Sequence, residues 1–119
     1  MIEKYGRQMK KGVLDMLVLK LLSVEPKYGY QLISELQASS EGVFVLKEGT
    51  LYPVLYRLEE EKLVVSKWSE PEGKQVPRKY YAITEKGQQA LAEIIEVWQQ
   101  IGAGVARILE DEKLLRKHM

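Results

Sequence analysis

The charged residues of this sequence include two local groups of lysines and arginines. They are Lys4, Arg7, Lys10 and Lys11 near the start, then Lys74, Arg78 and Lys79 without an intervening acid. Cationic clusters can bind phosphate groups, although a charge run is more often an ordinary solvated face. The clusters therefore raise nucleic-acid binding as a hypothesis that other motifs must support.

Groups that could catalyse a reaction are sparse. The chain has no cysteine, which excludes thiolate catalysis, disulfides and cysteine-ligated zinc. The single histidine, His118, stands next to the C-terminus, and Glu59, Glu60 and Glu61 fit a solvated helix end better than a metal site. Without a nucleophile–base pair or a phosphate-binding glycine loop, we expect no enzyme, metal or cofactor.

Composition sets the scale of the fold. The chain has 119 residues, of which 45% are hydrophobic and 29% are charged, which suits one domain with an appended element. No run of about 18 apolar residues could span a membrane. The opening MIEKYGRQMKK lacks the apolar core of a secretion signal. We therefore expect no membrane association and a cytoplasmic location.

Apolar periodicity predicts the elements that must position the charges. Helical spacing marks three helices, within residues 13–22, 28–40 and 48–65. The pattern then alternates in LVVSKWS and RKYYAIT, which predicts two strands joined by the loop EPEGKQVP. Thr84 caps a final helix, although Gly87 stands where a capping box has Glu or Gln.

Three helices followed by a β-hairpin are typical of the winged helix-turn-helix, in which the third helix enters the DNA major groove. We therefore expect a mainly α fold with a small β-hairpin and a long C-terminal dimerisation helix. The winged-helix DNA-binding domain would cover residues 1–83, and the dimerisation helix residues 84–119. A winged helix used only for protein–protein contact is the alternative, and salt dependence of DNA binding would separate the two.

The third helix allows two starting points. If Thr50 caps it, Pro53 falls in the first turn, where a missing N–H costs nothing. A start at Lys47 instead puts Pro53 in the second turn, with a possible kink near Gly49. In both cases the leading end, which touches bases and phosphates in a recognition helix, carries Gly49, Thr50, Tyr52 and Pro53. Tyr56 shares the face of Tyr52, and these rings either contact DNA or pack against the neighbouring helix.

Several segments, in this order and spacing, resemble the PadR-like family of transcriptional regulators. They are KKGVLDMLVLKLL, YGYQL, EGTLYPVLYRLEEEKLV, and PRKYYAIT followed by EKG, and they cover residues 10–87. The resemblance implies a homodimeric bacterial repressor that binds a palindromic operator through the third helix and the wing. The residues on motif positions are Tyr28, Gly49, Thr50, Tyr52, Pro53, Arg57, Arg78, Lys79 and Tyr80. The wing tip departs from a basic pattern with Glu70 and Glu72, so Lys74 and Arg78 are favoured over the tip itself.

The final helix carries an apolar stripe at heptad-like spacing, interrupted by Glu112. Its members are Leu91, Ile94, Trp98, Ile101, Val105, Ile108 and Leu115. A helix of some 30 residues extends about 45 Å, more than a domain this small covers alone. We expect it to pair two chains, to fold back on the first helix, or both. Gly102 and Gly104 either allow close helix approach or mark a break.

Trp98 also bears on ligand binding. In multidrug-responsive members of the family, flat aromatic compounds lie between paired tryptophans at the dimer centre. Trp98 occupies the comparable part of this helix, so the resemblance implies a planar aromatic inducer there. The alternative is that Trp98 is ordinary dimer core.

Overall fold

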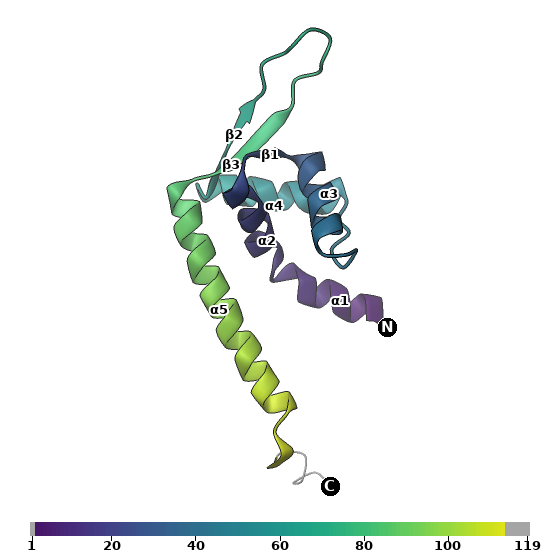
Figure 1. Ribbon diagram of the computed structural model, residues 1–119, viewed down its shortest axis with the longest axis vertical. Coiled ribbons are helices and arrows are strands. Elements are labelled where there is room, and N and C mark those ends of the chain that lie inside the picture. Colours follow the sequence, from purple (N-terminus) through teal and green to yellow (C-terminus); the bar gives the residue numbers. More distant parts are fainter. Residues whose placement is uncertain (1, 114–119) are drawn as a thin grey trace.

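The computed structural model describes residues 2–113. Along them run α1 (Ile2–Lys11), α2 (Leu14–Val24), β1 (Lys27–Tyr28), α3 (Gly29–Ser39), α4 (Glu48–Glu60), β2 (Val64–Trp68), β3 (Lys79–Ile83) and α5 (Glu85–Leu109). The β2–β3 hairpin projects from one end of the domain, and α5 starts near the base of the hairpin and extends beyond the opposite end (Figure 1). The expected winged helix-turn-helix with a long C-terminal helix is confirmed.

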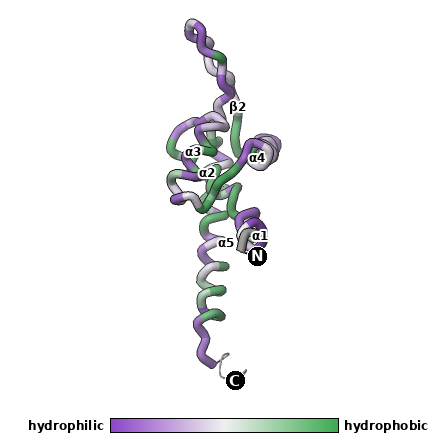
Figure 2. The backbone as a smooth tube through the Cα atoms, turned by 90° about the vertical axis from the view of Figure 1, so that its right-hand side faces the viewer, coloured by the Kyte–Doolittle hydropathy of each residue, from purple (hydrophilic) through white to green (hydrophobic). Residues whose placement is uncertain are grey.

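The core lies between α2, α3, α4 and the sheet. Its fully buried side chains are Val18, Leu19, Leu22, Leu32, Leu51, Leu55, Leu58, Val64 and Tyr81. The apolar run of α2 stands out as hydrophobic in Figure 2. α2 ends before Pro26, because the residue preceding a proline disfavours helical backbone, and Glu25 is extended there with φ −167°.

Between α3 and α4 the chain turns sharply. Glu41 and Gly42 both have positive φ, at 54° and 84°. The Gly42 N–H donates to the Gln37 carbonyl at 2.8 Å, which closes the end of α3 in the left-handed manner that glycine favours. The Ser40 hydroxyl also accepts from the Phe44 N–H at 2.9 Å, so the loop returns directly towards α4.

α4 begins at Glu48 with Lys47 as its N-cap, so the start at Thr50 is wrong and the earlier start is confirmed. The Leu51 N–H donates to the Lys47 carbonyl at 3.1 Å, which fixes this first turn. Pro53 therefore lies inside the helix and removes the N–H that would reach Gly49. Because Gly49 is exposed, water can satisfy its carbonyl.

The sheet has three antiparallel strands in the order β1–β3–β2, one more than the expected hairpin. β1 contributes two residues, with Lys27 opposite Tyr81 and Tyr28 opposite Tyr80. In the hairpin, Val64 pairs with Ile83 and Trp68 with Lys79. The loop 69–78 that joins β2 to β3, here called the wing loop, continues outward beyond these pairs (Figure 1).

α5 confirms Thr84 as its N-cap, with the side-chain oxygen accepting from the Gly87 N–H at 3.0 Å. The helix continues without a break through Gly102 and Gly104 and ends at Leu109. Its 25 residues span about 37 Å, somewhat less than expected. Leu115 and His118 fall outside the described residues.

α1 has no counterpart among the expected elements, because its ten residues are mostly polar, although the few apolar ones share one face of the helix. Within residues 2–113, no helix combines the length and apolar character needed to cross a membrane.

Candidate nucleic-acid interface

Tyr28 and Tyr80 join the start of α3 to the sheet. Their ring centroids lie 5.4 Å apart with an interplanar angle of 79°, an edge-to-face pair. This geometry follows from the strand register, which places the two residues directly opposite each other. Both rings are half-buried, so they form a rigid base rather than a mobile surface.

Arg78 and Lys79, where the wing loop enters β3, are here called the wing root, and their cations contact different aromatic rings. The Arg78 guanidinium lies 4.5 Å from the Tyr28 ring centroid, within cation–π range. Lys79 Nζ lies 5.8 Å from the ring of Tyr56 and 5.5 Å from the ring of Tyr81. The two neighbouring side chains therefore point towards different rings, Arg78 towards Tyr28 of β1 and Lys79 towards Tyr56 of α4.

Tyr52 packs against the first turn of α3. A Cβ added at Gly29 would lie 2.4 Å from Tyr52 Oη, so the tyrosine fills the space that glycine leaves. Tyr52 is half-buried, whereas Tyr56, whose ring centroid lies 5.9 Å away, is 54% exposed. Tyr52 therefore packs against the neighbouring helix, whereas Tyr56 is exposed and available for contact with another molecule.

The leading end of α4 is open to solvent. Gly49, Thr50 and Pro53 are exposed, and a Cβ added at Gly49 would meet nothing within 4 Å. The N-terminus of a helix carries a partial positive charge and N–H groups without intrahelical partners. This end therefore presents donors where another molecule can approach closely.

A cleft of about 400 Å³ lies between these elements. It is lined by Tyr28, Gly29 and Tyr30 at the start of α3, Tyr52 of α4, and Trp68, Arg78 and Lys79 of the hairpin. Sequence reasoning missed Tyr30 and Trp68, which are 67% and 63% exposed. The alternation in LVVSKWS could have identified Trp68, since it places a large ring on a strand end next to the wing.

Arg57 and Lys74 lie apart from this cleft. The Arg57 guanidinium forms an ion pair with Asp15 of α2, which ties α4 to the core helix. Lys74 is exposed in the wing loop, as are Glu70 and Glu72. The structure thus brings Tyr28, Tyr52, Arg78 and Lys79 together but does not bring Arg57 or Lys74 to the same place.

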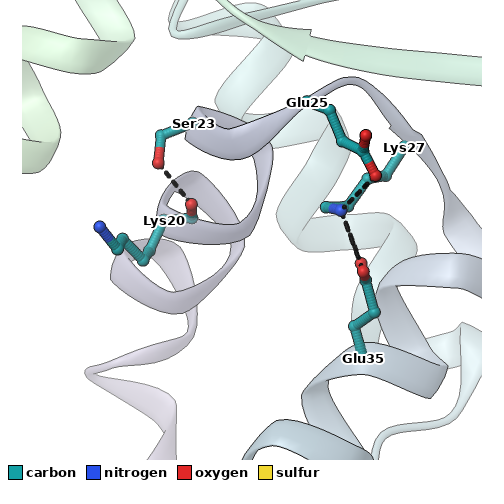
Figure 3. A network of polar contacts seen from close by, with 5 residues as sticks. All are labelled: Lys20, Ser23, Glu25, Lys27 and Glu35. Carbon is teal, nitrogen blue, oxygen red and sulfur yellow. Dashed lines mark hydrogen bonds and ion pairs between the residues drawn. The ribbon is translucent and has the colours of Figure 1, made fainter.

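Beneath the cleft, Lys27 is buried in a network that the sequence did not reveal (Figure 3). Its Nζ lies 3.2 Å from Glu25 Oε1 and 3.0 Å from Glu35 Oε1. Burial is the largest single influence on the Lys27 pKa and lowers it, but the hydrogen bonds and charges of Glu35 and Glu25 together outweigh burial. The net result is a pKa above the ordinary 10.5. Lys27 therefore stays charged and anchors β1 to α3.

Tyr81, which stands directly opposite Lys27 in the strand register, is completely buried. Burial, followed by the electrostatic effects of Tyr56, Glu59 and Tyr52, raises the pKa of its phenol to about 12. The Lys79 ammonium lies over this neutral ring and makes a cation–π contact with it.

The expected dimerisation residues divide into two groups. Leu91 is 7% exposed and Ile94 packs against the core of the same chain, because the first turns of α5 lie on α2. Leu91 thus packs within its own chain, and its place in a dimer interface stays a prediction. From the middle of the helix onward the stripe is uncovered: Trp98, Ile101, Val105 and Ile108 are 52%, 61%, 49% and 66% exposed. A groove of about 330 Å³, lined by residues that include Gly12, Met16 and Trp98, joins this stripe to α2.

Within residues 2–113, no grouping of three or more histidine, cysteine, aspartate or glutamate side chains could hold a metal ion. The acidic run Glu59–Glu61 does not form one, and Glu59 instead accepts a hydrogen bond from the Ser66 hydroxyl.

Comparison with known proteins gives a consistent result. Residues 18–93 match the family model described as "Transcriptional regulator PadR-like family". Protein X of Lysinibacillus sphaericus is 33% identical over 93 residues, which cover 76% of this chain and 83% of that protein.

Two solved structures extend the likeness to three dimensions. A PadR family transcriptional regulator from Eggerthella lenta DSM 2243 has a TM-score of 0.82 and 35% identity, covering 92% of this chain and 93% of that one. A PadR-like transcriptional regulator from Bacillus cereus strain ATCC 14579 has a TM-score of 0.73 and 36% identity, covering 87% and 97%.

Proposed function

The chain belongs to the PadR-like family of transcriptional regulators, and from this premise we propose that it is a cytoplasmic repressor that binds a palindromic operator as a homodimer. Residues 1–83 would bind DNA as a winged helix, and residues 84–119 would hold the dimer together. It would act through binding alone, without catalysis.

The observation that carries the DNA-binding proposal is the cleft that joins Arg78 and Lys79 to α4. Both cations line it together with Tyr52, which follows the exposed residues Gly49 and Thr50 along α4. A helix N-terminus and two cations supply the donors that phosphate oxygens accept. Tyr56, exposed on α4, lies on the same side as the Lys79 ammonium.

A salt titration tests this proposal. Duplexes selected from a random pool would be titrated by fluorescence anisotropy across a range of salt concentrations. Arg78→Ala should weaken binding to all duplexes about equally and lower the salt slope by about one, because phosphate contacts carry no sequence information. Arg107→Ala, an exposed arginine near the end of α5, is the matched control and should change neither quantity. An unchanged slope in Arg78→Ala would remove this residue from the interface, and binding without salt dependence would favour the protein–protein alternative.

The dimer proposal is supported by the uncovered stripe of α5. Four large apolar side chains from Trp98 to Ile108 face solvent in a single chain. α1 adds Tyr5 and Met9, which are 51% and 77% exposed. Contiguous exposed apolar surface of this kind marks a protein interface.

Single charges placed on α5 test the dimer. Val105→Glu should shift the protein from dimer to monomer in sedimentation at micromolar concentration, because it buries a charge in the interface. Ala103→Glu adds the same charge to an exposed position on the other face of the helix and should leave the dimer intact. If both variants sediment like the wild type, the α5 stripe is not the dimer surface.

We further propose that a planar aromatic inducer stacks against Trp98. The indole is half exposed and lines the groove beside Gly12 and Met16. To release DNA, such a ligand must bind one dimer geometry better than the other. Planar dyes should quench Trp98 emission in a Trp68→Phe background, which leaves Trp98 as the only tryptophan. Dyes that alter neither this emission nor operator affinity would leave Trp98 as ordinary dimer core.

A further inference from the structure

Two exposed aromatic rings line the same cleft although they come from distant parts of the chain. Tyr30 lies in the first turn of α3, Trp68 ends β2, and they are 67% and 63% exposed. Both line the same cleft of about 400 Å³. Exposed large rings brought together in this way form an apolar wall that a binding partner can cover.

The charge of the cleft restricts what can cover this wall. Arg78 and Lys79 also line it, and the described side chains that line it include no carboxylate. A ligand that matches the cleft must therefore join an anionic group to an apolar, ring-sized surface. A nucleotide of the DNA backbone has this combination, since its phosphate is charged and its deoxyribose presents C–H groups.

Arg78 and Trp68 offer different groups to a ligand in the cleft. Arg78 is held over the Tyr28 ring at 4.5 Å, and its backbone N–H donates to the Ser69 hydroxyl at 2.8 Å, so the cation has a defined place. Trp68 pairs with Lys79 in the hairpin register, one residue before Ser69. The register therefore places Trp68 beside Lys79, while Arg78 lines the same cleft. The indole N–H can only donate, which suits a phosphate oxygen.

We propose that Trp68 and Tyr30 form a sugar-binding wall, which packs on the deoxyribose of a backbone nucleotide whose phosphate is bound by Arg78. This inference rests on the proposed DNA binding and assigns a role to two residues outside the recognition helix. A contact to sugar carries no base information, so it should strengthen binding to every duplex. It also neutralises no phosphate, so it should leave the salt slope unchanged.

The test combines fluorescence with two substitutions at Trp68. In a Trp98→Phe background, Trp68 is the only tryptophan, and its emission should change on titration with duplex and saturate together with anisotropy. Trp68→Ala should weaken binding to selected and random duplexes alike, by about tenfold, through the loss of buried apolar area. Trp68→Phe, which keeps a ring, should recover most of this affinity. Circular dichroism would verify that each variant is folded.

The matched control is Val65→Ala, which shortens an exposed apolar side chain on the opposite face of the same strand. It should bind DNA like the wild type. Tyr30→Ala provides a second variant on a different element and should weaken binding in the same sequence-independent way.

The outcomes separate this inference from the proposed function. If DNA binding is salt-dependent but Trp68→Ala binds like the wild type, or Trp68 emission stays constant at saturation, the sugar wall is refuted and DNA binding stands. A loss confined to one duplex sequence would refute it too, by showing a base contact. If no duplex binds the wild type, both proposals fail together.

Discussion

Gly87 occupies the tightest contact in the joint between the domain and α5. A Cβ added there would lie 2.1 Å from the Leu63 carbonyl oxygen and 2.7 Å from Ile83 Cγ1, whereas ordinary van der Waals contacts lie at 3.4–4 Å. The Leu63 carbonyl cannot simply retreat, because it accepts from the Thr84 N–H at 3.0 Å. The methyl group that Gly87→Ala adds must therefore displace backbone, either that of α5 or that of Leu63.

The expected magnitude follows from two opposing effects. Overpacking a closed site costs about 1–3 kcal/mol, and this contact lies at the severe end because backbone must move. Replacing a helical glycine by alanine returns up to about 1 kcal/mol. We expect Gly87→Ala to lower the free energy of unfolding by about 2 kcal/mol and the Tm by roughly 8 °C.

Gly102→Ala is the matched control in the same helix. A Cβ at that position would meet nothing within 4 Å, so only the helix-propensity gain remains. We expect this variant to be more stable than the wild type by up to about 1 kcal/mol. Both variants would be unfolded with urea and followed by circular dichroism at one fixed protomer concentration, because dimerisation makes stability concentration-dependent. Sedimentation would verify that they share one oligomeric state. Gly87→Ala as stable as Gly102→Ala would refute the close approach of α5 to Leu63.

Three further substitutions test contacts within the site and beside it. Lys27→Met should lower the free energy of unfolding by about 2 kcal/mol in urea denaturation, less than for a fully buried pair because its two glutamate partners stay partly exposed. Since the Lys27 pKa is raised above 10.5, the stability that the charged Lys27 contributes is complete below that pH and is lost as pH rises through the folded-state pKa. If the difference in unfolding free energy between the wild type and Lys27→Met grew at high pH instead, this sign would be wrong. Gly29→Ala should displace the end of the Tyr52 ring, which can move, so anisotropy should show weaker DNA binding while stability falls by less than about 1 kcal/mol; wild-type affinity would place this ring outside the interface. Arg57→Ala should cost no more than about 1 kcal/mol of stability, because its ion pair is half exposed, and a larger loss by urea denaturation would show that the pair is stronger than its exposure indicates.

Features that depend on residues close together in the chain could be predicted from the sequence. The apolar spacing in residues 14–24 and 48–60 reflects one buried face per helix, and this periodicity is local. The alternation on either side of EPEGKQVP predicts a hairpin for the same reason. Thr84 caps α5 because its side chain reaches an N–H only three residues away. The family motifs were likewise readable as residue types at set distances.

The burial of residues whose contacts lie far away in the chain could not be predicted from the sequence. Lys27 reads as a solvated cation, and only the packing of β1 against β3 buries it between two glutamates. Leu91 has the spacing of an interface residue, and only the seating of α5 on α2 assigns it to the core. The start of α4 was ambiguous because no side chain caps it, so propensity had no local signal to read.

The amino-acid sequence by itself determined α2 to α5, the hairpin, their order and the residue types available for DNA, because each depends on neighbours within one or two turns. The tertiary structure alone decided which of those residues share a surface. Tyr30 and Trp68 stand 38 positions apart and line one cleft only because β3 pairs with both β1 and β2. Tyr52 and Tyr56 are equivalent on a helical projection, yet the absence of a side chain at Gly29 draws one ring inward and leaves the other exposed. Such choices depend on long-range packing, which no local pattern encodes.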